Sequence, residues 1–426
     1  MAREKMKYSD RVRKKHSHVG KTFILVALTA FQWVSFLPVF FSEKGGGLLT
    51  AALLCAYVSF EWMYVVFMHF AVKKVNFELE FIAFFFSGIG MCLIAGEYGA
   101  KGMLKQMVMV IAGVVAYDIL LWFLKDVKRV MAVRKYVGFL ALVFFAAAFV
   151  YIRFVARTYI NGAYNWIYIG PISFQPSEIV KIAFIFVGAA TLDKLLTAKN
   201  IYLYILFSMG CIGILFLMKD FGTALIYFFT FIVVAFMRSG DLRSIVFICA
   251  GALIGAVLIF TFLPHVAARF ETYRHIWDDP FGRGYQQTSV LICAASGGLR
   301  GLGVGNGRLR DVYADVTDLV FGLVCEELGL IIAFAIVIAF AFICVYAVRC
   351  AKSAPSSFYS IAACAAAAMI LFQTCLNIFG ITDLLPLTGV TLPFISQGGS
   401  SMVSCWALFA FIKAADIRAY PKIYKS

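Results

Sequence analysis

The chain has 426 residues, of which 62% are hydrophobic and 14% are charged, and its formal net charge is +15. A soluble domain is about half apolar and a quarter charged, so this chain carries more apolar surface than a water-soluble fold can bury. The composition excludes a soluble enzyme, a disordered chain and a secreted disulfide scaffold. The apolar runs are continuous rather than alternating, which argues against a porin-type barrel.

The positive charge is typical of a membrane protein whose Lys and Arg gather in cytoplasmic loops, and it is compatible with binding to anionic lipid headgroups. We expect membrane lipids and no nucleic acid among the partners. The eleven cysteines include no CxxC pair and form no cluster with the histidines. This pattern predicts small buried side chains, with neither disulfides nor a metal site of Cys and His.

Residues 1–20 form a basic tail, and the apolar run after it lacks a small-residue cleavage site, so we interpret that run as a membrane helix rather than a signal peptide. A spanning helix needs about 20 mostly apolar residues. About twelve such segments predict an all-α polytopic membrane protein. They lie near 21–41, 46–72, 79–97, 103–124, 137–157, 176–192, 201–218, 222–237, 243–263, 319–348, 356–380 and 400–415.

Basic connections such as 125–135 alternate along the chain with less basic ones, which predicts that the basic side and both termini are cytoplasmic. The predicted organisation has a cytoplasmic tail, three blocks of membrane helices and one large extracytoplasmic loop. The boundaries are 1–20 for the tail, 21–136 and 137–263 for the first two helical blocks, 264–318 for the loop, and 319–426 for the C-terminal helices with a short tail.

The loop 264–318 contains six arginines and no lysine. Arginine without lysine suggests bidentate contacts to phosphate or carboxylate, and the alternative is a set of Arg–Asp pairs that fold the loop on itself. The loop also carries the run SGGLRGLGVGNG at 296–307. No strand precedes this run and no GK[ST] closes it, so we expect close backbone packing against a membrane surface or lipid headgroup rather than nucleotide binding.

Ionisable residues inside membrane segments are costly and are functional candidates by default. We expect Glu61 and Asp118 to be satisfied polar contacts. Glu178 and Lys181 stand three residues apart at the start of a helix, so they share a face and can pair. For the adjacent Glu326 and Glu327 we expect capping and interhelix hydrogen bonds.

Asp318 ends the Arg-rich loop at the outer mouth of a predicted span. Two interpretations stay open at this stage. The residue has the chemistry of a helix N-cap, and an acid at the mouth of a span is also a candidate for catalysis.

Four blocks together resemble the SEDS family (FtsW, RodA and SpoVE). They are FQPSEIVKIAF (174–184), DPFGRGYQQTSVLICAASGGLRGLGVGNG (279–307), TDLVFGLVCEELGLI (317–331) and LPLTGVTLPFISQGGSS (385–401). They occur in family order at family-like spacing, and the resemblance covers roughly residues 137–426. It implies a ten-helix core, here with two additional N-terminal helices, in the bacterial cytoplasmic membrane.

The resemblance implies a peptidoglycan glycosyltransferase that polymerises lipid II on the outer face of the membrane, releases undecaprenyl diphosphate, and works with a class B penicillin-binding protein. The essential family acid falls on Asp318, with Glu178 and Lys181 near it. Further substrate contacts are expected from the loop arginines and from the family blocks. They are Arg269, Arg300, Arg308, Arg310, Trp166, Gln175, Ser296, Gly297, Gly298, Ser396, Gly398, Gly399 and Ser400.

The chain departs from the family pattern at several positions. Val316 stands where the family usually has His, Asn165 where it has Arg, Gln397 where it has Tyr, and MKDFGT (218–223) where it has QPDLGT. Asp318, Glu178 and Lys181 are unaffected.

We hypothesise that Asp318 is the general base that takes a proton from the acceptor 4-hydroxyl, and that displacement inverts the anomeric carbon because no second free carboxylate is available as a nucleophile. Loop arginines, with a divalent cation (Mg²⁺ or Mn²⁺) as an open addition, would neutralise the leaving diphosphate. Lys181 would do the same or would hold Asp318 ionised. The alternatives are a lipid-linked precursor transporter (flippase) and a scaffold for the penicillin-binding protein.

Overall fold

The computed structural model describes residues 2–42, 47–70, 72, 76–160, 162–170, 172–192, 198–239, 246, 250 and 273–416. The span predicted at 243–263 therefore falls almost wholly outside the described residues, as does the start of the predicted outer loop. Arg269, a predicted substrate contact, lies in that part.

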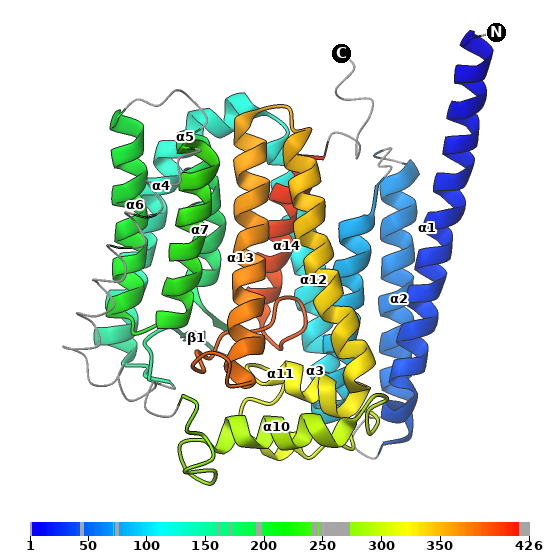
Figure 1. The fold of residues 1–426 in the computed structure, drawn as a ribbon, viewed down its shortest axis with the longest axis vertical. Coiled ribbons are helices and arrows are strands. Elements are labelled where there is room, and N and C mark those ends of the chain that lie inside the picture. Colours follow the sequence, from blue (N-terminus) through cyan, green and yellow to red (C-terminus); the bar gives the residue numbers. More distant parts are fainter. Residues whose placement is uncertain are drawn as a thin grey trace.

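Two N-terminal helices, α1 (Ala2–Phe41) and α2 (Gly47–Phe70), pack against the next helix along the chain (Figure 1). Polar side chains of these helices form hydrogen bonds inside the membrane layer. Gln32 Nε2 donates to Glu61 Oε1 at 2.8 Å, and Tyr64 Oη donates to Asp118 Oδ1 at 3.3 Å. Glu61 and Asp118 therefore each have a polar contact, as expected, but the second oxygen of Glu61 has no hydrogen-bond partner among the described residues.

Helix α3 (Glu78–Leu124) is a helical hairpin that reverses at Gly99, whose φ of 62° and ψ of −157° are not helical. A straight helix of 47 residues would be roughly 70 Å long. Yet Tyr117 donates a hydrogen bond to the carboxylate of Glu80, 37 residues away. The two halves therefore lie side by side as antiparallel helices, as predicted for 79–97 and 103–124. Glycine tolerates the positive φ that this reversal needs.

Helix α4 (Val127–Val150) continues into a π-helix, η1 (Tyr151–Ala156). A short antiparallel hairpin of β1 (Ile167–Ile169) and β2 (Ile172–Phe174) follows, with Tyr168 opposite Ser173. The prediction of a purely helical chain missed this hairpin, because three-residue strands are too short to leave a periodic pattern in the sequence.

Three apolar helices come next: α5 (Pro176–Leu192), α6 (Ala198–Leu217) and α7 (Phe221–Ser239). After the residues that are not described, α10 (Tyr285–Gly297) lies across one end of the bundle (Figure 1). A 3₁₀ turn, η2 (Leu309–Asp311), leads toward the next membrane segment.

The helix predicted at 319–348 is broken rather than continuous. It consists of α11 (Val320–Leu323), a π-helical turn η3 (Val324–Leu328) and α12 (Gly329–Lys352). The break falls at Gly329, whose φ is 84°. Helices α13 (Ser357–Ile381) and α14 (Gly399–Ala414) complete the bundle.

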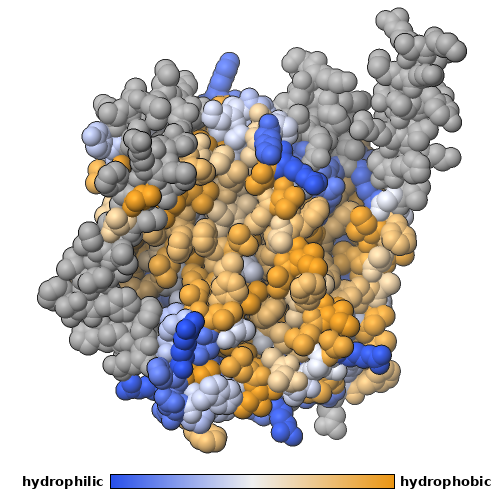
Figure 2. All heavy atoms as spheres, viewed as in Figure 1, coloured by the Kyte–Doolittle hydropathy of each residue, from blue (hydrophilic) through white to orange (hydrophobic). Residues whose placement is uncertain are grey.

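Six helices in the described part of the chain are long and apolar enough to cross a membrane, and one of them is the α3 hairpin. Shorter apolar helices cover Tyr202–Leu217, Phe221–Met237 and Gly399–Ala414. Figure 2 shows apolar side chains across the middle of the visible face and hydrophilic ones gathered toward its two ends. The chain is thus a multi-pass membrane protein.

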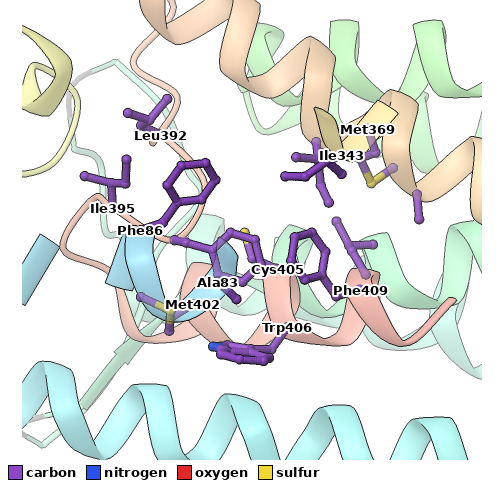
Figure 3. Packing of buried hydrophobic residues seen from close by; sticks show 14 of the residues in the cluster. Ala83, Phe86, Ile343, Met369, Leu392, Ile395, Met402, Cys405, Trp406 and Phe409 are labelled. Atoms are coloured by element: carbon purple, nitrogen blue, oxygen red, sulfur yellow. The ribbon is translucent and has the colours of Figure 1, made fainter. Parts of the chain in front are cut away.

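Trp406 of α14 is fully buried in the hydrophobic cluster (Figure 3). Its ring centroid is 5.3 Å from that of Phe84 and 5.8 Å from those of Tyr117 and Phe394. A Cβ at Gly113 would lie 2.5 Å from the indole, so only glycine allows this approach. Small residues permit such close contacts between helices in lipid, where packing replaces the hydrophobic effect.

Candidate active site

A cavity of about 880 Å³ opens at the end of the bundle where α10 and the β-hairpin lie (Figure 1). Its lining comes from the β-hairpin region, α5, the α6–α7 connection, the loop before α11, and the loop between α13 and α14. Six residues predicted from the sequence line it: Trp166, Gln175, Glu178, Lys181, Arg310 and Asp318. Segments far apart in the sequence therefore meet around one polar space.

The carboxylate of Asp318 faces this cavity and accepts no hydrogen bond from any residue that the structure describes. Its backbone is held instead, because Asn377 Nδ2 donates to the Asp318 carbonyl at 2.7 Å. Oδ2 lies next to Gly389, where an added Cβ would be 3.4 Å away. The N-cap of α11 is Leu319 and no side chain caps that helix, so the alternative of Asp318 as a helix cap is wrong.

A second loop holds the Asp318 segment in place by hydrogen bonds to its backbone. Ser396 Oγ donates to the carbonyl of Thr317 at 2.5 Å, and Gln397 N donates to the carbonyl of Val316 at 2.8 Å. Ser396 is buried and does not line the cavity. Its placement supports the catalytic segment rather than a substrate contact.

Gly398, Gly399 and Ser400, also predicted to contact substrate, open helix α14 and do not line the cavity. Ser400 Oγ accepts a hydrogen bond from Gln175 N at 3.2 Å. A Cβ at Gly399 would lie 3.0 Å from the Met109 sulfur. These residues join α14 to its neighbours at the edge of the site.

Glu178 and Lys181 form the predicted pair, with Nζ 2.7 Å from Oε1 and side chains only 5% and 2% exposed. Lys181 also donates to Gln373 Oε1 at 2.8 Å. Ser404 donates to the other Glu178 oxygen. The ammonium of Lys181 is thus already held by an acid and an amide, and Glu178 is committed to its partners rather than free as a nucleophile.

Asp220 is a site residue that the sequence analysis did not single out. It is 7% exposed and lines the cavity. Its carboxylate accepts hydrogen bonds from Gln175 Nε2 at 2.9 Å, from Asn165 Nδ2 at 3.2 Å and from the backbone N of Thr223 at 3.2 Å. The signal lay in MKDFGT, which keeps the acid of the family block while its other residues change.

Burial raises the pKa of Asp318 to about 7, and the negative charge of Asp220 adds to the effect. Burial also raises the pKa of Asp315, in the same loop, to about 6. A carboxyl group with a pKa near neutrality is suited to proton transfer at physiological pH.

The outer loop is anchored by two acids of η3. Arg310 lines the cavity, but its guanidinium donates to Glu327 at 2.5 and 2.6 Å and to Glu97 at 3.1 Å. Glu326 accepts hydrogen bonds from the backbone N of Arg308 at 2.7 Å and of Leu309 at 3.0 Å. The expected hydrogen-bonding role of Glu326 and Glu327 is confirmed, and Arg310 pairs with acids outside its own loop.

The remaining loop candidates lie away from the cavity. The side chains of Arg300, Arg308 and Ser296 are exposed and do not line it. Gly297 packs against η3, where an added Cβ would lie 2.2 Å from the Cys325 carbonyl, and Gly298 caps α10 with a φ of 55°. Gly297 of the glycine run therefore packs against protein backbone.

Two cations that were not among the predicted site residues line the cavity: Lys219 and Arg283. No group of three or more His, Cys, Asp or Glu within the described residues could hold a metal ion. Asp318 is the unengaged carboxylate beside Asp220, whose oxygens already accept three hydrogen bonds.

The comparisons with known proteins agree with this architecture. The family model described as a cell cycle protein, FTSW_RODA_SPOVE, matches residues 66–420. Stage V sporulation protein E of Bacillus subtilis is 34% identical over 253 residues, covering 57% of this chain and 68% of that protein. The peptidoglycan glycosyltransferase RodA of Mycobacterium tuberculosis is 28% identical over 351 residues, covering 76% of this chain and 74% of that protein.

Solved structures share the fold. A structure described as showing coordination of polymerization and crosslinking by a peptidoglycan synthase complex contains a chain with a TM-score of 0.67 and 23% identity, covering 82% of this chain and 99% of that one. The crystal structure of the rod shape determining protein RodA of Thermus thermophilus has a TM-score of 0.60 at 21% identity, covering 82% and 98%.

Proposed function

This chain belongs to the FtsW, RodA and SpoVE family of cell cycle proteins, and we propose on that premise that it polymerises lipid II. It is a peptidoglycan glycosyltransferase, as relatives such as RodA are named. The cytoplasmic membrane is its location, with about twelve crossings, both termini cytoplasmic and the cavity on the outer face. The basic 125–135 segment lies at the start of α4, and the cavity-lining residues from Ile160 onward follow its other end, which supports this orientation.

Asp318 is the proposed general base, and the observation that carries this role is its unengaged carboxylate on the cavity wall. The carboxylate takes the proton of the acceptor 4-hydroxyl while that oxygen bonds to the anomeric carbon of the donor. The bond from the anomeric carbon to the diphosphate oxygen breaks, and undecaprenyl diphosphate leaves with the bonding electrons. A reaction with Asp318 as its one catalytic carboxylate is consistent with inversion by direct displacement.

The roles of the neighbouring residues follow from their contacts. Lys181 is neutralised by Glu178, so this pair is a structural support in the cavity wall rather than a direct participant. Lys219 and Arg283 are better placed than the exposed Arg300 and Arg308 to meet the negative charge of the diphosphate. Trp166 and Gln175 remain proposed substrate contacts.

A divalent cation, Mg²⁺ or Mn²⁺, would add positive charge at the diphosphate. The described residues do not form a dedicated metal site, because no group of three or more His, Cys, Asp or Glu among them could hold a metal ion. No step of the proposed reaction therefore depends on a cation. A class B penicillin-binding protein is the proposed partner, and the fold shared with a chain of a peptidoglycan synthase complex is consistent with it.

Polymerisation of labelled lipid II by the purified chain, with its co-expressed partner and a transpeptidase inhibitor, tests the function. We expect glycan ladders. Movement of lipid II across a bilayer without polymer would support the flippase instead. A preparation that still binds the penicillin-binding protein but shows neither polymerisation nor lipid movement would support the scaffold.

The rate of polymerisation should depend on the ionisation of Asp318. Because its pKa is raised to about 7, the base is protonated below that pH and ionised above it. We expect kcat/KM to rise with pH and to reach half its plateau near pH 7. Asp220→Asn removes the neighbouring negative charge, so its half-maximal pH should be lower than that of the wild type.

Asp315→Asn is the matched control, because Asp315 lines the same cavity and also has a raised pKa, whereas the charge that acts on Asp318 is that of Asp220. Its pH profile should keep the midpoint of the wild type. A midpoint that moves with Asp315→Asn and stays fixed with Asp220→Asn would show that the titrating group is Asp315 and not Asp318.

A further inference from the structure

A second cavity, of about 310 Å³, lies beside the end of α4 and is lined by Arg153, Phe154, Arg157, Tyr159 and Tyr164. It belongs to the stretch where η1 ends and the chain turns toward the β-hairpin. None of the predicted site residues lines it. Its lining combines two cations with aromatic rings.

The local backbone brings the two arginines to this cavity. The π-helix η1 ends at Arg157, whose φ is 50°, a left-handed conformation that is uncommon for a residue with a side chain. Single π-helical turns occur frequently at functional sites. Arg153 Nη1 donates to Tyr164 Oη at 3.0 Å, and its guanidinium lies 4.7 Å from the centre of that ring.

Neither arginine forms an ion pair with an acid in the described part of the chain. This differs from Arg310, whose guanidinium is shared between two glutamates. Arg153 and Arg157 therefore leave two positive charges without a protein counter-charge at one small cavity. Guanidinium groups match phosphate oxygens through paired hydrogen bonds.

The position along α4 places the cavity at the membrane surface. The apolar span Val127–Ala156 is 30 residues long, or roughly 45 Å at the rise of an α-helix, so its two ends reach opposite headgroup layers. Phe154 and Val155, at the same end as the arginines, are 64% and 68% exposed. Cations at the rim with apolar side chains beside them suit a lipid phosphate and its acyl chains.

Arginines at a membrane surface often only extend toward the headgroups without a specific ligand. Here Arg153 instead lies against Tyr164 within a cavity that adjoins the larger one. Tyr159 and Tyr164 have ring centroids 4.7 Å apart, and Lys219 Nζ lies 5.4 Å from the Tyr159 ring centre. Lys219 in turn lines the 880 Å³ cavity. Cations thus contact both rings of this pair, Arg153 at Tyr164 and Lys219 at Tyr159.

We propose that the Arg153–Arg157 cavity binds the phosphate of a membrane lipid at the face where the large cavity opens. Two lipids offer this chemistry: an anionic phospholipid, and the polyprenyl diphosphate that the polymerisation consumes or releases. The second source rests on the proposed function, and the first does not.

Native mass spectrometry of the full chain, released from nanodiscs, measures the site directly. The probes are phosphatidylglycerol, undecaprenyl diphosphate and, as a zwitterionic reference, phosphatidylcholine. The variant is Arg153→Gln/Arg157→Gln. The matched control is Lys101→Gln/Lys105→Gln, which removes two positive charges from exposed side chains just after the Gly99 reversal, on helix α3.

We expect the arginine variant to lose about tenfold in affinity for at least one phosphate lipid, and the lysine control to bind as the wild type does. Arg153→Lys/Arg157→Lys should recover part of the binding, because it keeps the charge but not the paired hydrogen bonds. Unchanged binding by the Gln variant, or an equal loss in the lysine control, would overturn the site.

The two sources separate in the same experiment. A loss confined to phosphatidylglycerol supports a structural phospholipid, and a loss of undecaprenyl diphosphate supports a docking site for the donor or product. Because binding is measured without polymerisation, a chain that binds these lipids at this site but makes no glycan would refute the proposed function and leave the site intact. If the wild type makes glycan and the Gln variant binds these lipids normally, the lipid site is refuted and the proposed function stands.

Discussion

Asp318→Asn should reduce lipid II polymerisation by about 10³-fold, within the 10²–10⁴-fold range of general-base catalysis. The amide has nearly the shape of the carboxyl group, and the contacts that hold this segment go to its backbone, so the loop should keep its place. The substitution also removes a charge whose burial raises the pKa of Asp318 to about 7. We therefore expect the folded variant to be as stable as the wild type at neutral pH, or more so.

Glycan ladder assays beside thermal unfolding in detergent measure both parts of this prediction. Asp278→Asn is the matched control, because it makes the same change of acid to amide on a side chain that is 76% exposed in the outer loop. It should polymerise normally. Ladders from Asp318→Asn at the wild-type rate would remove Asp318 from the role of base.

Breaking the buried Glu178–Lys181 pair should have the largest effect on stability. Glu178→Gln leaves the Lys181 ammonium without its counter-charge, and Lys181→Met does the same to the carboxylate, at a cost of about 3–5 kcal/mol each. The double variant Glu178→Gln/Lys181→Met removes both charges, so it should recover most of the loss. Thermal unfolding of the four proteins in the same detergent measures the coupling between the two residues.

The activity of the double variant separates support from participation. A folded double variant that still polymerises lipid II would agree with a structural role for the pair in the cavity wall. Losses that simply add, with no recovery in the double variant, would contradict the pairing. An inactive double variant of normal stability would give the pair a part in the chemistry.

Local patterns in the sequence were sufficient to predict a mostly helical membrane protein and the pairing of Glu178 with Lys181, since both depend on near neighbours along the chain. They also indicated that Glu326 and Glu327 would be hydrogen-bonded. The motif order pointed to Asp318. None of this required knowledge of how distant segments meet.

Contacts between segments that are distant in the sequence could not be predicted in this way. Arg310 finds its acids on α3 and η3, 213 and 17 residues away. Ser396 meets Thr317 across 79 residues, and Lys413 of α14 meets Glu80 of α3 at 3.2 Å across 333 residues. Loop composition alone could not decide which arginines face the cavity, because that depends on contacts brought together by the fold.

The main-chain hydrogen bond between the two loops at the site allows the residues that form it to differ between relatives. Val316 and Gln397 are two positions where the chain departs from its family, and they are linked through the amide of one and the carbonyl of the other. A hydrogen bond between main-chain atoms does not depend on the identity of the two side chains. Both side chains nevertheless line the cavity. Mutation at these positions can therefore change which substrate the cavity accepts while Asp318 keeps its position.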